Sequence, residues 1–153
     1  MEFKSYIPTF RGRFAGRWIY GCLAEIGNGN SNSYIVDRGN SGTLMRVETD
    51  TLSMSTGLLD ANGQMIYDGD ILDFCGDKVL VYWNEECFMW KTELLDGDRT
   101  VGHNWSRDDC KDDLGWIAAE FPILGQMTTK VIGNRWDNPE LIPKEEIEDT
   151  VPY

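Results

Sequence analysis

The Asn62-Gly63 pair, set between two apolar stretches, is the feature that most constrains how this chain folds. A type I′ turn requires a positive φ at both central residues, and Asn followed by Gly tolerates that conformation well. Such a turn joins two antiparallel strands whose twists match. The sequence therefore predicts a β-hairpin here, followed by a tight turn at Tyr67–Asp70 that leads into a strand reaching Phe74.

Other runs rich in β-branched and aromatic residues also have the length and loose alternation of strands. Turn residues at 27–33 and at 84–86 separate two pairs of them into further hairpins. We therefore expect an all-β or β-dominated single domain spanning residues 1–153, with at most short helices such as one at 143–149. The predicted strands cover residues 17–24, 33–36, 44–51, 67–74, 78–83, 87–94 and 130–134.

Two segments depart from this strand-and-turn pattern. Residues 96–113 are polar and acidic and predict a surface insertion, and residues 116–121 predict a short element that ends before Pro122. Residues 142–153 predict an acidic tail. We expect the sheet to lie in the remainder of the chain.

The charge of −12 is distributed unevenly, and this bears on the partner. Residues 1–46 carry a balance of +3, whereas residues 47–153 carry −15. Such a field repels a nucleic-acid backbone, because affinity for phosphate depends on clustered cations. Direct nucleic-acid binding is therefore disfavoured, although Arg11 and Arg13 in the basic start offer one route to it. These cations could instead meet an acidic partner or the acidic part of a second copy.

A second alternative uses the acidic half of the chain. Four carboxylates within six residues would repel one another if stacked on a helix, so they favour either a solvated loop or an imitation of nucleic-acid phosphates. In the latter case the protein would inhibit a basic, DNA-binding host protein. The four residues are Asp108, Asp109, Asp112 and Asp113.

The N-terminus lacks the basic segment and apolar stretch of a secretory signal, and no apolar run approaches the roughly 18 residues of a membrane span. The four cysteines are dispersed, which together with the absent signal favours reduced thiols. We expect a cytoplasmic protein.

No set of residues predicts catalysis or a cofactor. The carboxylates of Asp68, Asp70 and Asp73 crowd one turn but lack the spacing of a calcium loop. A zinc site would need ligands with paired spacing, and Cys75, Cys87, His103 and Cys110 lack it. We therefore expect no enzyme activity, no metal and no cofactor.

The six tryptophans supply candidate contact residues, since aromatic side chains often anchor interfaces. Trp105 and Trp136 lie in polar surroundings, which predicts exposure. We expect them to contact a protein partner or a second copy in a homo-oligomer.

Three motifs, in order along the chain, resemble the YopX family. The longest is Ser55–Leu72, which reads S-T-G-L-L-D-A-N-G-Q-M-I-Y-D-G-D-I-L. The second is Val131–Leu141, which reads V-I-G-N-R-W-D-N-P-E-L, and a looser one joins Phe10–Arg13 with Gly16–Gly21. The insertion at 96–113 and the tail after 142 lie outside the resemblance.

The resemblance implies a partly open SH3-like β-barrel carried by a phage or prophage, and it brings no catalytic residues. Our leading hypothesis is that this chain is an accessory protein of a phage or prophage and works by protein–protein contact inside the bacterial host. The nucleic-acid mimic and the nucleic-acid binder remain as alternatives.

Overall fold

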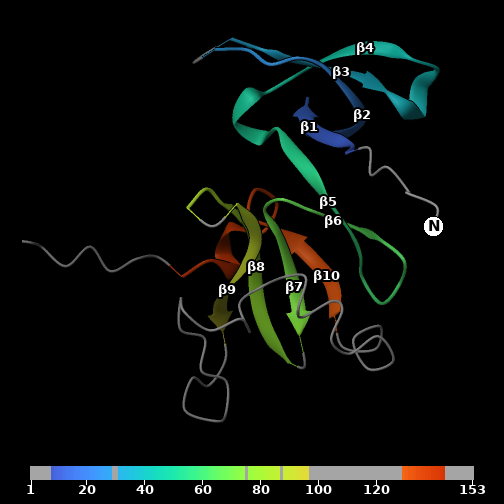
Figure 1. Ribbon diagram of the computed structural model, residues 1–153. Helices are drawn as coiled ribbons and strands as arrows, with labels where there is room; N and C mark the ends of the chain where they lie inside the picture. Colours follow the sequence, from blue (N-terminus) through green and yellow to red (C-terminus); the bar gives the residue numbers. More distant parts are fainter. Residues whose placement is uncertain (1–7, 29–30, 75, 87, 97–128, 144–153) are drawn as a thin grey trace, which may run out of the picture.

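A computed structural model describes residues 8–28, 31–74, 76–86, 88–96 and 129–143. These residues form ten strands in two antiparallel sheets, with short 3-10 turns between some of them. In Figure 1 the strands β1–β4 lie above β7–β10, and β5 and β6 connect the two groups. The expected β-dominated fold is confirmed, and the described strands close no barrel.

The first sheet has six strands in the order β4-β3-β2-β1-β5-β6. Its hairpin β1–β2 turns at Ala15 and Gly16, which both have positive φ as a two-residue turn of this kind requires. The 3-10 turns η1 (Arg38–Asn40) and η2 (Thr49–Thr51) link β3 to β4 and β4 to β5. The strands are β1 (Phe10–Phe14), β2 (Arg17–Glu25), β3 (Ser33–Asp37), β4 (Thr43–Val47), β5 (Ser53–Leu59) and β6 (Met65–Tyr67).

The second sheet has four strands in the order β10-β7-β8-β9. The strands β7 (Asp70–Phe74), β8 (Asp77–Asn84) and β9 (Met89–Asp96) form consecutive hairpins, and β10 (Thr129–Asn134) pairs with β7 at the other edge. A 3-10 turn, η4 (Pro139–Leu141), follows β10.

Each sheet has a core of its own, and β5–β6 couples them. Ile19, Ile35 and Val47 are buried in the first sheet. The second core gathers residues of β7–β9 around Ile66, which belongs to β6 of the first sheet, and Leu58 of β5 packs against it. Burial of a side chain such as Ile66 stabilises the fold by roughly 1.5–3 kcal/mol. The hairpin β5–β6 thus belongs to one sheet by hydrogen bonding and to the other core by packing.

The turn at Asn62-Gly63 joins β5 to β6 as predicted, but its type differs. Gly63 has a φ of +76°, whereas Asn62 is not among the residues with positive φ. The reason is Asp60, whose buried carboxylate accepts hydrogen bonds from the backbone N–H of Asn62 and of Gln64. That carboxylate also accepts the N–H of Val131 on β10, so the turn is shaped by a contact far along the sequence.

Most of the predicted strands are present with bounds shifted by a few residues. The strand expected over 44–51 ends earlier, at Val47, because η2 follows. The first strand, Phe10–Phe14, lies in the basic start of the chain. The element expected at 116–121, nearly all of the insertion, and the tail beyond residue 143 lie outside the described residues.

Gly69, between β6 and β7, is the glycine on which the junction of the two sheets depends. Its φ is +81°, and a Cβ atom there would lie 2.6 Å from the ring of Trp136. Its N–H donates to the carbonyl of Val81, and its carbonyl accepts the N–H of Arg135. The residue at this position must therefore adopt the left-handed backbone conformation and must also lack a side chain.

We predict that Gly69→Ala destabilises the protein by more than Gly16→Ala does. Both substitutions impose a left-handed alanine, costing about 1–2 kcal/mol, but Gly16 has no atom within 4 Å of the added carbon. Displacing the Trp136 ring should add roughly 1–3 kcal/mol. Urea denaturation of both variants measures the difference, and equal midpoints would refute the packing role of Gly69.

Candidate functional site

The three motifs noted in the sequence converge at the junction between the sheets. Arg11 and Arg13 lie on β1, the Tyr67–Asp70 turn joins β6 to β7, and the segment after β10 carries Trp136 and Asp137. The centre of this cluster, termed here the junction cluster, is formed by Arg11, Trp18, Tyr67, Asp70 and Trp136.

An ion pair between Arg11 and Asp70 lies at the middle of the junction cluster. The Nη2 atom of Arg11 is 2.7 Å from Oδ1 of Asp70, and the two side chains are only 5% and 1% exposed. Arg11 also donates from Nε to the hydroxyl of Ser53 and from Nη2 to the backbone carbonyl of Asp68. The other carboxylate oxygen of Asp70 accepts the backbone N–H of Tyr67. This pair links the first sheet to the second.

Aromatic rings enclose the guanidinium of Arg11. Its carbon lies 4.7 Å from the ring centre of Trp18, 4.8 Å from that of Tyr67 and 6.0 Å from that of Trp136. Trp18 and Trp136 pack edge to face, with ring centres 5.5 Å apart. A cation over an aromatic face is stabilised by the ring's quadrupole, most strongly where water is excluded. The rings therefore offset part of the cost of burying the charge.

A second ion pair closes the outer side of the cluster. Arg13 pairs with Asp137, whose carboxylate also accepts hydrogen bonds from Nε1 of Trp18 and Nδ2 of Asn134. Asn134 holds the loop in turn, because its side-chain oxygen accepts the N–H groups of Trp136 and Asp137. The loop after β10 is thus held against β1 and β2 by polar contacts.

Burial acts on the two carboxylates of the turn. It raises the pKa of Asp70 above 3.8, an effect that Arg11 offsets only in part. Burial also raises the pKa of Asp68, against the opposing influence of Arg135 and Arg11 and of backbone N–H groups at Gly69 and Trp83. Both groups therefore bind a proton more readily than an exposed aspartate does.

The junction cluster is built to hold the sheets together rather than to meet a ligand. Its central cation is 4% exposed and cannot reach a phosphate or a substrate without breaking the ion pair. No group of three or more potential metal-binding side chains occurs among the residues that the structure describes. The carboxylate of Asp70 is already paired with Arg11, and that of Asp73 accepts the N–H of Gly76.

An open groove of about 230 Å³ lies beside the junction cluster and has a different character. Apolar residues from both sheets line it, and Asp68 is the one charged residue of its lining. Ser53, which accepts from Arg11, also lines it. We call this the junction groove; its remaining lining residues are Phe10, Leu52, Met54, Trp83 and Trp90.

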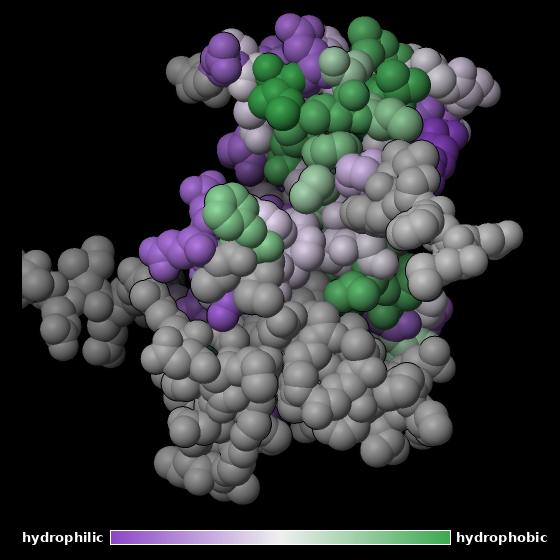
Figure 2. All heavy atoms as spheres, viewed as in Figure 1, coloured by the Kyte–Doolittle hydropathy of each residue, from purple (hydrophilic) through white to green (hydrophobic). Residues whose placement is uncertain are grey.

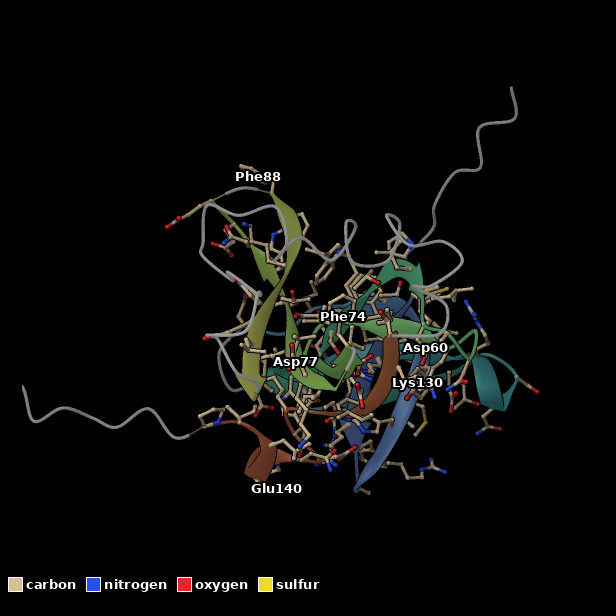
Figure 3. The ribbon with its side chains drawn as sticks, turned by 90° about the horizontal axis from the view of Figure 1, so that it is seen from below. Asp60, Phe74, Asp77, Phe88, Lys130 and Glu140 are labelled. Atoms are coloured by element: carbon tan, nitrogen blue, oxygen red, sulfur yellow. The ribbon has the colours of Figure 1, made fainter. Side chains whose placement is uncertain are left out.

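Trp83 extends the junction groove toward the tip of the β8–β9 hairpin. Trp83 is 39% exposed and packs edge to face on its cross-strand partner Trp90, with ring centres 5.2 Å apart. At the tip, Phe88 is 80% exposed and has a φ of +50°. Figure 3 shows Phe88 projecting from the end of this hairpin. A bulky residue rarely adopts positive φ, so the hairpin presents a large apolar side chain in a strained conformation.

A second apolar surface covers part of the first sheet. Figure 2 shows hydrophobic side chains gathered over the upper part of the molecule, where β1–β4 lie. Leu44 of the edge strand β4 is 58% exposed and Ile26, just after β2, is 59% exposed. A substitution on this face can therefore serve as the control when the β8–β9 tip is tested for contact with a partner.

The structure places several of the contact residues proposed from the sequence in surroundings other than those expected. Trp136 is half-buried against Trp18 and Gly69, whereas exposure was expected, because η4 and the Asn134 contacts fold its loop back. Arg11 and Arg13 lie together but pair with Asp70 and Asp137 of the same chain. The remaining proposed contact residues lie outside the described residues: Trp105, Asp108, Asp109, Asp112 and Asp113. Cys75, Cys87, His103 and Cys110 lie outside them as well.

Sequence reasoning missed Phe88, Trp83 and the junction groove. Phe88 follows the turn residues 84–86 and was assigned to a strand, where aromatic side chains usually face a core. The available signal was Asn84, a residue type that favours turns because its side chain accepts a nearby backbone N–H, here that of Glu86.

Comparison with known proteins agrees with the motif evidence. Residues 10–143 match the family model described as YopX protein. No match was found among curated proteins. The match includes every residue of the junction cluster and of the junction groove.

We predict that Arg11→Met destabilises the protein by about 3–5 kcal/mol, because it leaves the Asp70 carboxylate buried without its countercharge. Adding Asp70→Asn should recover part of this loss, since a neutral amide needs no cation and can still accept the Tyr67 N–H. Urea denaturation of wild type, both single variants and the double variant gives the coupling free energy. Additive effects of the two substitutions would contradict the pairing.

We predict that acidification increases the free energy of unfolding through Asp68. Its pKa is raised in the folded state, so the folded protein binds a proton before the unfolded chain does. The stabilisation grows as pH falls from above the raised pKa toward 3.8 and is lost as pH rises again. Asp70, with a pKa raised in the same direction, contributes with the same sign.

Denaturation of wild type and Asp68→Asn at about pH 7 and about pH 4.5 measures this contribution. Asp68→Asn should shrink the gain in stability on acidification, whereas Asp50→Asn, at an exposed position, should leave it unchanged. An identical gain in wild type and Asp68→Asn would refute the assignment.

Proposed function

This chain belongs to the YopX family, and we propose that it is a non-enzymatic accessory protein of a phage or prophage that acts by binding another protein in the cytoplasm of the bacterial host. The observation that carries this proposal is Phe88, a large apolar side chain 80% exposed in a strained backbone conformation. Strain of this kind costs of order 1–3 kcal/mol and is retained mainly at functional positions.

The surroundings of Phe88 support contact with a protein. Aromatic residues are enriched at the centres of protein interfaces, where a few of them supply most of the binding energy. Trp83 lies on the same hairpin and lines the junction groove, so the groove would extend the contact beyond one side chain. The described residues include no helix long and apolar enough to cross a membrane.

Arg11 and Arg13 each form an ion pair with an aspartate of the same chain, and this favours the proposal over direct nucleic-acid binding. Arg11 is buried against Asp70, and Arg13 is engaged by Asp137. Phosphate binding requires cations that can approach the backbone. The two arginines proposed for that role serve instead to join the sheets.

We predict that the protein captures a specific partner from host lysate and that Phe88→Asn abolishes the capture. Asparagine accepts a left-handed backbone better than phenylalanine does, so this variant should fold at least as well as wild type. The Phe88-dependent partner should persist at high salt, because apolar contacts are not screened. Tagged wild type and variant are compared by mass spectrometry of the captured proteins.

Leu44→Ser is the matched control, because it removes an exposed apolar side chain from the first sheet. It should leave capture unchanged. If Phe88→Asn and wild type recover the same proteins, or if Leu44→Ser alone loses them, the β8–β9 tip is not the contact surface. A partner lost at high salt but indifferent to Phe88 would instead favour the acidic mimic at residues 108–113.

A further inference from the structure

We infer that the junction groove binds an arginine side chain presented by the partner protein. The inference rests on the proposed function and names the chemistry of the contact. It comes from three features of the groove: its apolar walls, its single acidic residue, and the absence of an ion pair between that residue and any described cation.

The walls of the junction groove suit the stem and head of a long basic side chain. Leu52 and Met54 line one part, and the indoles of Trp83 and Trp90 line another. Arginine packs its methylene stem on apolar surface while its guanidinium stacks on aromatic rings. An apolar ligand would fill the same walls but would leave the carboxylate of Asp68 without a partner of opposite charge.

Asp68 is positioned to accept such a cation. Backbone N–H groups at Gly69 and Trp83 lower the pKa of its carboxyl group against the effect of burial, and it forms no ion pair with another described residue. The charged groups near it are Arg135, Arg11 and Asp70. Arg11 is already bound to Asp70, which leaves the partly buried Asp68 with only longer-range cations. Burial raises its pKa for that reason, and a bound guanidinium would lower it.

The protein uses the same combination of groups internally. In the junction cluster a guanidinium lies among Trp18, Tyr67 and Trp136 and pairs with an aspartate. The junction groove repeats this pattern with Trp83, Trp90 and Asp68 but holds no cation of the described residues at its centre. The charge of −12 adds long-range attraction for a basic partner.

The test is a titration of the full-length protein with three capped pentapeptides that differ only in the central residue: arginine, lysine or citrulline. Citrulline has the shape of arginine without its charge. The measured quantity is the chemical shift of the tryptophan indole N–H signals in isotope-labelled protein, with Trp83→Phe and Trp90→Phe used to assign the two groove signals.

The arginine peptide should shift the Trp83 and Trp90 signals saturably, and the citrulline peptide should not. Asp68→Asn should weaken the arginine peptide's binding by roughly tenfold or more, the effect of losing a charge-assisted contact. Asp50→Asn, which removes the same charge from an exposed position, should leave it within about twofold, as screening of a surface charge implies. Lysine should bind more weakly than arginine, because its ammonium is more strongly hydrated.

Equal shifts with arginine and citrulline would overturn the inference and identify an apolar site. Unaltered affinity in Asp68→Asn would overturn it as well. Binding that appears only after Arg99 and Arg107 are changed to glutamine would assign the groove to the chain's own segment instead of a partner. Partner capture that depends on Phe88 without any arginine binding would refute this inference and leave the proposed function standing; arginine binding without partner capture would do the reverse.

Discussion

The buried ion pair between Arg11 and Asp70 is the contact on which the rest of this structure depends. Two sheets with separate cores meet here, joined by the β5–β6 hairpin and by the contacts that surround this pair. Burying both charges is costly, and the cost is recovered only if each charged atom finds good partners. Arg11 meets that condition through Ser53, the Asp68 carbonyl and three aromatic rings. Such a network tolerates only one relative placement of the sheets, so it fixes geometry more than it adds stability.

Local chemistry explains which parts of the fold the sequence could predict. The alternation in residues 78–83 and the turn residues before Ile71 specify strands and bends without reference to distant residues, and those predictions were confirmed. The type of the turn at Asn62-Gly63 could not be predicted in this way, because Asp60 is held by Val131 of β10. Trp136 was expected to be exposed for a similar reason: its neighbours in the sequence are polar, but its neighbours in space are Trp18 and Gly69.

The same distinction applies to the candidate site. The arginines were recognised as a group, yet their partners Asp70 and Asp137 lie 59 and 124 residues away along the chain, and no pattern in one sequence pairs them. The junction groove draws its lining from β1, β5, β8, β9 and the turn at Asp68, so it exists only once the sheets have met. The role of Phe88 can be recognised only from the backbone of the folded chain, which has a positive φ at this residue.

The junction groove and the junction cluster share a wall, and this has a consequence for binding. Asp68 accepts a hydrogen bond from Arg11 through its backbone carbonyl and Ser53 accepts one through its hydroxyl, and both residues line the groove. A ligand in the groove would therefore contact groups whose positions are already set by the inter-sheet network. Because those groups need not reorganise, little of the binding free energy is lost in ordering them. The rigid contact that unites the two sheets thus also prepares the surface beside it for a partner.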